Sequence, residues 1–137
     1  MKKHFMAVLF ACALLATPTQ VFAWSNPQNI AAPYMLLIKI AKANLTISSK
    51  EATISCSVVS SSDSATKAEI DAELQVKDGY TWRHVADWQT SESGDEAFLS
   101  ATQTVVPGHT YRVETTVTIW DGDQYESQTI YSPEQTA

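Results

Sequence analysis

Alternation of apolar and polar residues runs through most of this chain and constrains its fold more than any other feature. In three runs every second residue is apolar, with only Thr115 departing: 52–58, 68–76 and 111–119. A period of two places the apolar side chains on one face of a β-strand, so each run predicts a half-buried antiparallel strand. Less regular runs predict strands at 34–40, 44–48, 81–90, 97–105 and 125–131. Seven or eight strands spaced about ten residues apart predict an all-β fold, an antiparallel β-sandwich.

Two Asp-Gly pairs predict tight hairpins between these strands. Lys77-Asp78-Gly79-Tyr80 lies between two extended stretches, and Asp121-Gly122-Asp123-Gln124 joins the strand ending at Trp120 to the last one. In such a turn we expect positive φ at both central positions, which favours Asp-Gly. The continuous apolar run at 35–41 leaves a helical turn open as an alternative to the first strand.

The N-terminal segment has the features of a secretory signal peptide. Lys2 and Lys3 precede an apolar stretch at 5–16, and Val21-Phe22-Ala23 has small residues where signal peptidase needs them, which predicts cleavage after Ala23. The apolar stretch is too short to span a bilayer, so we expect no stable membrane insertion after cleavage. Lipidation at Cys12 is an alternative that would leave the protein anchored. We therefore divide the chain into a signal peptide (1–23), a flexible leader (24–33), the sandwich (34–132) and a flexible tail (133–137).

The remaining chain is acidic and carries one cysteine. Cleavage removes two lysines and no acid, which changes the formal net charge from −6 to −8. Nucleic acid is therefore not an expected partner, because phosphate binding needs clustered Lys and Arg. Cys56 lies on the apolar face of its run and is predicted to be a buried, inert thiol.

One segment resembles the immunoglobulin-like sandwiches. Pro107-Gly108-His109-Thr110-Tyr111-Arg112-Val113 is similar to the turn and strand opening of fibronectin type III domains. The resemblance implies that Tyr111 forms a tyrosine corner and that Val113 occupies the place of a second bridging cysteine, facing Cys56 across the core. The Trp expected on the third strand is missing, so the antibody subclass is not supported.

Most of the chain after the signal also resembles small secreted immunoglobulin-like proteins of unknown function in Gram-positive bacteria, such as Clostridia. The order of parts carries this likeness: the signal, the 52–58 strand, Leu74-Gln75 before the Asp-Gly turn, Trp82 and Trp88, and the Pro-Gly-x-x-Tyr-Arg-Val segment. The family has no established activity, so the resemblance implies the fold and the extracellular location but transfers no site.

Residues for catalysis or metal binding are sparse. After signal cleavage only His84 and His109 remain, and neither belongs to a known catalytic or zinc-binding motif. Asp121 and Asp123 are weak calcium candidates, since a turn explains them without a metal. We therefore predict a protein that is not an enzyme and that uses no cofactor; an enzyme without a recognisable motif is a distant third alternative.

The tryptophans on the 81–90 strand are the main candidates for ligand binding. If that strand is regular, Trp82, His84 and Trp88 share one face and form an aromatic strip. Alternatively, a bulge near His84 sends Trp82, Val85 and Trp88 into the core. The first arrangement suits a carbohydrate-binding module. The second favours a secreted, non-catalytic module that binds another protein at the cell surface or in the medium.

Overall fold

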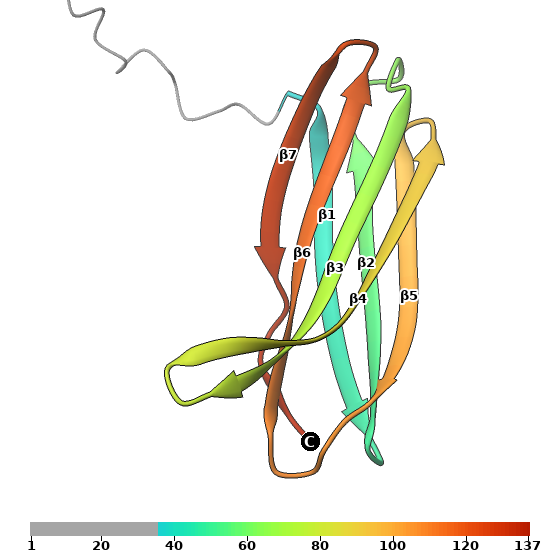
Figure 1. Cartoon of the computed structure of the whole chain (residues 1–137). Coiled ribbons are helices and arrows are strands. Elements are labelled where there is room, and N and C mark those ends of the chain that lie inside the picture. Colours follow the sequence, from blue (N-terminus) through green and yellow to red (C-terminus); the bar gives the residue numbers. More distant parts are fainter. Residues whose placement is uncertain (1–35) are drawn as a thin grey trace, which may run out of the picture. The chain divides into compact units, whose positions relative to one another are not determined.

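The computed structural model describes residues 36–137, which form eight β-strands without a helix (Figure 1). The strands are β1 (Ile38–Ser48), β2 (Glu51–Ser60), β3 (Lys67–Asp78), β4 (Thr81–Ser93), β5 (Glu96–Thr104), β6 (Thr110–Asp121), β7 (Gln124–Tyr131) and β8 (Gln135–Thr136). They pair only in antiparallel fashion. The predicted all-β fold is confirmed.

The strands divide between two sheets that face each other. One has the order β1-β2-β5, and the other has the order β4-β3-β6-β7. In the second sheet β8 pairs with the first two residues of β6, beyond the part of β6 that pairs with β7. The chain crosses between the sheets after β2, after β4 and after β5. This is a β-sandwich, in which each sheet turns one face to the core and the other to solvent.

The core consists of the alternating apolar residues that the sequence pattern singles out. The largest buried side chains include Ile54, Val58, Ile70, Leu74, Val113, Val117 and Ile119. Cys56 is buried among them, and burial raises the pKa of its thiol. The thiol therefore stays protonated and unreactive at neutral pH.

Both ends of the described chain differ from expectation. The predicted strands 34–40 and 44–48 are parts of one continuous strand, β1, and no helical turn occurs at residues 36–41. The tail expected at 133–137 belongs to the fold: β8 pairs with β6, and Ala137 N donates to His109 O at 2.9 Å. The alternation is too short in this tail to predict a strand. The signal peptide, Cys12 and the leader lie outside the described residues.

The hairpin turns also differ in detail. Asp78 pairs with Thr81 and Asp121 pairs with Gln124, so each aspartate ends a strand and its glycine takes the first central position. Gly79 (φ 62°) and Gly122 (φ 61°) have positive φ, whereas the residues after them do not. The turn with two positive φ values is instead Ser49-Lys50, at 50° and 69°, between β1 and β2. Neither residue is a glycine, and so the sequence does not reveal this turn.

Two contacts involve residues that the immunoglobulin-like resemblance singles out. The Tyr111 hydroxyl accepts a hydrogen bond from Val106 N at 2.9 Å, which closes the turn before β6. The hydroxyl that bonds the Cys56 thiol, however, belongs to Thr115, two positions beyond Val113. The strands are therefore offset relative to the pairing that the resemblance implies.

Candidate functional site

A β-bulge in β4 decides where the two tryptophans point. Leu74 of β3 pairs with Ala86, but the next residue, Gln75, pairs with His84, so Val85 is an extra residue on β4. An extra residue breaks the period of two. Two residues on either side of Val85 whose numbers differ by an even amount, such as Trp82 and Trp88, therefore lie on opposite faces of the sheet.

Trp82 and Trp88 consequently do not form a shared strip. Trp88 pairs with Ala72 and packs against the core together with Val85. Trp82 pairs with Lys77 on the outer face, next to Arg112. The regular-strand arrangement is wrong, and the bulge arrangement is correct for Val85 and Trp88 but not for Trp82.

Trp82 belongs to an aromatic–cation cluster on the outer face of the larger sheet, made of Lys77, Trp82, Arg112 and Tyr131. The Arg112 guanidinium carbon lies 4.2 Å from the Trp82 ring centroid and 4.4 Å from that of Tyr131. Lys77 Nζ lies 5.6 Å from the Trp82 ring on its own hairpin. Each contact is a cation–π interaction, in which a positive charge lies over a negative ring face.

Gln75 holds Arg112 in this position. Its side chain is buried; its Oε1 accepts a hydrogen bond from Arg112 Nε at 2.8 Å, and its Nε2 donates to Glu73 Oε1 at 3.1 Å. Gln75 and Arg112 are direct partners in the β3–β6 register, which explains why they meet. The ion pairs formed within residues 36–137 do not include Arg112, whose described side-chain contacts are with Gln75 and the rings of Trp82 and Tyr131.

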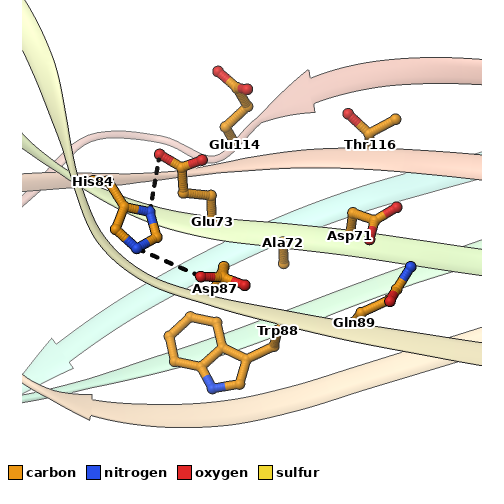
Figure 2. A pocket seen from close by; sticks show the side chains of 9 residues that line it. All are labelled: Asp71, Ala72, Glu73, His84, Asp87, Trp88, Gln89, Glu114 and Thr116. Atoms are coloured by element: carbon orange, nitrogen blue, oxygen red, sulfur yellow. Dashed lines mark ion pairs between the residues drawn. The ribbon is translucent and has the colours of Figure 1, made fainter.

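An open hollow of about 330 Å³ lies beside the cluster on β3, β4 and β6 (Figure 2). Four carboxylates line it, from Asp71, Glu73, Asp87 and Glu114. His84 lies between two of them, with Nδ1 3.5 Å from Glu73 Oε1 and Nε2 3.4 Å from Asp87 Oδ1. The hollow is shallow and negatively charged, and the residues that line it include no serine or cysteine nucleophile.

The β3–β4 hairpin extends beyond the body of the sandwich and ends at Tyr80 (Figure 1). Tyr80 is fully exposed, at the second central position of the turn. The bulge at Val85 lies where this hairpin leaves the sheet, and bulges bend the strands that carry them. The hairpin thus presents an aromatic side chain close in sequence to the cluster.

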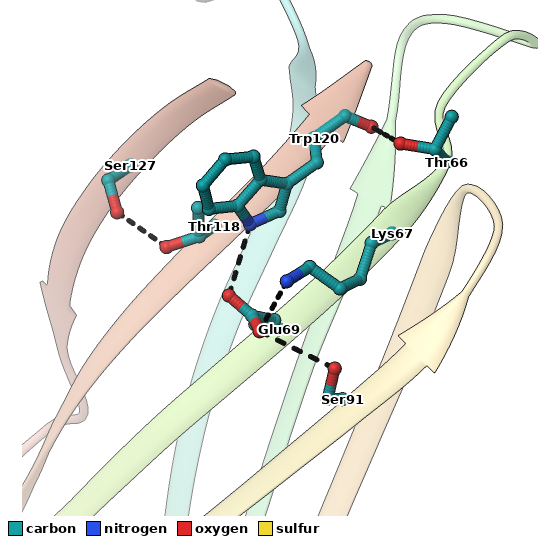
Figure 3. Close-up of polar contacts among 7 residues, drawn as sticks. All are labelled: Thr66, Lys67, Glu69, Ser91, Thr118, Trp120 and Ser127. Atoms are coloured by element: carbon teal, nitrogen blue, oxygen red, sulfur yellow. Dashed lines mark hydrogen bonds and ion pairs between the residues drawn. The ribbon is translucent and has the colours of Figure 1, made fainter. Parts of the chain in front are cut away.

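A second group of aromatic and charged side chains lies at the opposite end of the same face (Figure 3). Glu69 accepts hydrogen bonds from Trp120 Nε1 at 3.0 Å and from Ser91 Oγ at 3.5 Å, and Lys67 Nζ lies 2.9 Å from its carboxylate. These contacts, with Lys67 contributing most, lower the pKa of Glu69. The Trp120 ring also stacks on Tyr125, with centroids 4.7 Å apart.

The remaining predicted residues do not meet at a site. His109 is exposed in the turn before β6, and Asp121 accepts hydrogen bonds from Ser62 and Ser64 at 3.0 and 2.7 Å. Over residues 36–137 no three His, Cys, Asp or Glu side chains converge in a way that would hold a metal ion. In the same part of the chain, no helix is long and apolar enough to cross a membrane.

No protein-family model matches this chain, and no curated protein is significantly similar to it. The site must therefore be judged on its geometry. Sequence reasoning found Trp82 but missed Gln75, Arg112, Tyr131 and Tyr80. Of these four residues, the sequence pattern could have singled out only Arg112, because it lies at the outward position between the apolar residues Tyr111 and Val113. The contacts of the other three depend on strand register.

Proposed function

We propose that this chain is a secreted, non-catalytic β-sandwich module that binds another protein through the aromatic–cation cluster. The observation that carries the proposal is the Arg112 guanidinium held between Trp82 and Tyr131 on an otherwise polar sheet face. Trp, Tyr and Arg are the residue types that contribute most to binding energy at protein interfaces. Gln75 fixes Arg112 before any partner arrives, which reduces the entropy lost on binding.

The surroundings of the cluster support a protein partner. Tyr80 adds an exposed aromatic side chain at the hairpin tip, where it is free to enter a pocket on another molecule. The carboxylates of the neighbouring hollow favour basic residues at the rim of the interface.

We also propose that the module is immunoglobulin-like, of the fibronectin type III kind, and is exported by the segment 1–23. The Tyr111 hydroxyl contact and the division of eight strands between two sheets support the first part. The charged and apolar regions of the segment, followed by small residues, support the second.

Binding of glycans by Trp82 and Trp88 has weaker support. Flat sugar rings need aromatic faces that share one surface, and these two indoles lie on opposite faces of the sheet. A glycan site would have to depend on Trp82 alone, whose ring already stacks on Arg112.

The test is a pull-down from the culture medium and cell-surface fraction of the producing cells, with three immobilised proteins compared. These are the wild type, the Tyr80→Ser/Trp82→Ala variant, and the control Phe98→Ser, whose changed side chain is exposed on the other sheet. A protein retained by the wild type and the control but lost with the double variant supports the proposal, and its affinity is then measured by calorimetry. Equal retention by all three would contradict it. A response of tryptophan fluorescence to bacterial or host glycans, with no protein partner, would favour the glycan function instead.

A further inference from the structure

β7 is the outermost strand of the larger sheet, and one of its sides is open (Figure 1). It pairs with β6 on one side, and no strand within residues 36–137 is hydrogen-bonded to the other. Ser132 N donates to Val113 O at 2.9 Å in the same register, so the even-numbered residues of β7 direct their backbone groups to β6. Tyr125, Ser127, Thr129 and Tyr131 therefore direct theirs to the open side.

Two of the other three edge strands carry features that hinder pairing with another chain. β1 has Lys39, Lys42 and a bulge at its start, and β4 has Arg83, Asp87 and the Val85 bulge. Charges and bulges of this kind are how sheet proteins block their edges. β5 carries a single charged residue, Glu96, and no bulge.

β7, like β5, has neither a bulge nor more than one charged residue. Its only charged residue is Glu126, and that carboxylate is already bound to the backbone N–H groups of Leu37 at 2.6 Å and Ile38 at 3.1 Å. The strand contains no lysine, proline or bulge. An extended strand of the right sequence could therefore add to it without displacing anything that the structure describes.

The outward-facing residues of β7 are arranged symmetrically about Gln128. From one end to the other they read aromatic, hydroxyl, hydroxyl, aromatic: Tyr125, Ser127, Thr129, Tyr131. When a second β7 runs antiparallel about a twofold axis at Gln128, Tyr125 pairs with Tyr131 of the second copy and Ser127 with Thr129 of the second copy. Each of these pairs exchanges two backbone hydrogen bonds. Glu126 then faces Ile130, so no like charges oppose each other.

We propose that two copies of this chain associate through antiparallel pairing of β7 with β7, centred on Gln128. The result is one continuous sheet with five strands from each copy. The side chains strengthen the pairing, since Tyr125 and Tyr131 are exposed in the single chain and gain a cross-strand aromatic neighbour. This inference does not rest on the proposed function: it is drawn from the open edge of β7, although Tyr131 also belongs to the aromatic–cation cluster.

Sedimentation velocity of the purified protein over a range of concentrations tests the proposal. The wild type is expected to shift from monomer to dimer. Ser127→Lys/Thr129→Lys is expected to remain monomeric, because each lysine would face another across the axis. The matched control is Ser100→Lys/Thr102→Lys, the same spacing of exposed residues on the β5 edge, and it is expected to dimerise like the wild type. A wild type that is monomeric throughout, or a control that loses the dimer, would overturn the proposal. Near-UV circular dichroism verifies that each variant is folded.

Cysteine cross-linking tests the register separately. Gln128→Cys places two thiols directly opposite each other at the axis, so mild oxidation is expected to give a covalent dimer on a non-reducing gel. Gln124→Cys changes the same residue type on the same strand but lies far from its own copy in this register, and is expected to remain monomeric. Cys56 is buried and does not compete. Equal cross-linking of the two variants, or none in Gln128→Cys, would contradict the centred register.

Discussion

The thiol of Cys56 on β2 and the hydroxyl of Thr115 on β6 lie 3.2 Å apart in the middle of the core. Both side chains are buried, and each is the polar partner of the other across the two sheets. Thr115 is the residue that interrupts the apolar alternation of its strand. The interruption is therefore explained by a hydrogen bond that the one-dimensional pattern cannot show.

A double-mutant cycle measures this contact. Cys56→Ala is expected to lower the free energy of unfolding by about 2 kcal/mol, since it leaves a small cavity and an unpaired buried hydroxyl. Thr115→Val removes the hydroxyl itself, so the double variant should be more stable than the sum of the single effects predicts, by about 1 kcal/mol. Urea denaturation of the four proteins gives the coupling energy. Simple additivity would mean that the two groups do not interact.

The same contact identifies where an engineered disulfide fits. Thr115→Cys should form a bridge with Cys56 under oxidising conditions and stabilise the protein by about 3 kcal/mol. Val113→Cys, the substitution that the immunoglobulin-like resemblance suggests, serves as the comparison and should retain two free thiols. Thiol titration of the unfolded proteins distinguishes the two. Bridging in Val113→Cys alone would show that the strand offset is wrong.

Tyr111→Phe tests the closed turn before β6. Removal of the hydroxyl leaves Val106 N without its acceptor, and we expect a loss of about 1 kcal/mol in the free energy of unfolding. The ring remains buried, so the native fold should be retained. An unchanged thermal unfolding curve would mean that Tyr111 acts only through packing.

Lys50→Gly should stabilise the β1–β2 hairpin. A side chain at φ 69° is strained, and glycine relieves this by about 1 kcal/mol, partly offset by its greater freedom when unfolded. Gly79→Ala is the reciprocal change: φ is 62°, a Cβ would meet nothing within 4 Å, and the expected loss therefore comes from the backbone alone. Thermal melts should move in opposite directions. A destabilised Lys50→Gly protein would indicate that its side chain matters more than the strain.

Glu69 should make stability depend on acid pH. Its pKa is lowered in the folded state, mainly by Lys67, so its stabilising contribution is present above the unfolded pKa of about 4.5 and is lost as the pH falls through the folded value. Glu69→Gln removes this dependence and costs less than about 1 kcal/mol at neutral pH, because the ion pair is partly exposed. The free energies of unfolding of the two proteins, measured between pH 7 and pH 3 to span the ordinary Glu pKa, should therefore converge as the pH falls. Parallel curves would show that the pair has no effect.

Strand identity was predictable because, apart from Thr115, the inward residues of the runs 52–58, 68–76 and 111–119 are apolar with a period of two. Ile54, Ile70 and Val117 all lie in the core where this period places them. The β8 strand was not predictable, since two residues are too few for a period to be recognised. Its pairing with β6 depends on the position of the chain after Ser132, whose contacts with Val113 arise only in the folded protein.

The candidate site was predictable only in part. Trp82 is visible in the sequence as a large aromatic residue on a polar strand, but its neighbours Arg112 and Tyr131 are far along the chain. Their meeting depends on the registers that join β4, β3, β6 and β7, and on Val85 being accommodated as a bulge rather than in regular pairing. No local pattern specifies that residue, because Val85 is as suitable for a regular strand as for a bulge.

The Val85 bulge affects the direction of the β3–β4 hairpin as well as the face on which the side chains of β4 lie. Deleting Val85 would let His84 and Ala86 follow each other in regular pairing with Gln75 and Leu74, so Trp82 and Trp88 would keep their present sides. The bend at the base of the hairpin would be lost, however, and Tyr80 would be carried along the line of the sheet instead of away from it. The one extra residue in β4 thus controls the direction in which the hairpin extends, while the side chains on the outer face of the sheet stay the same.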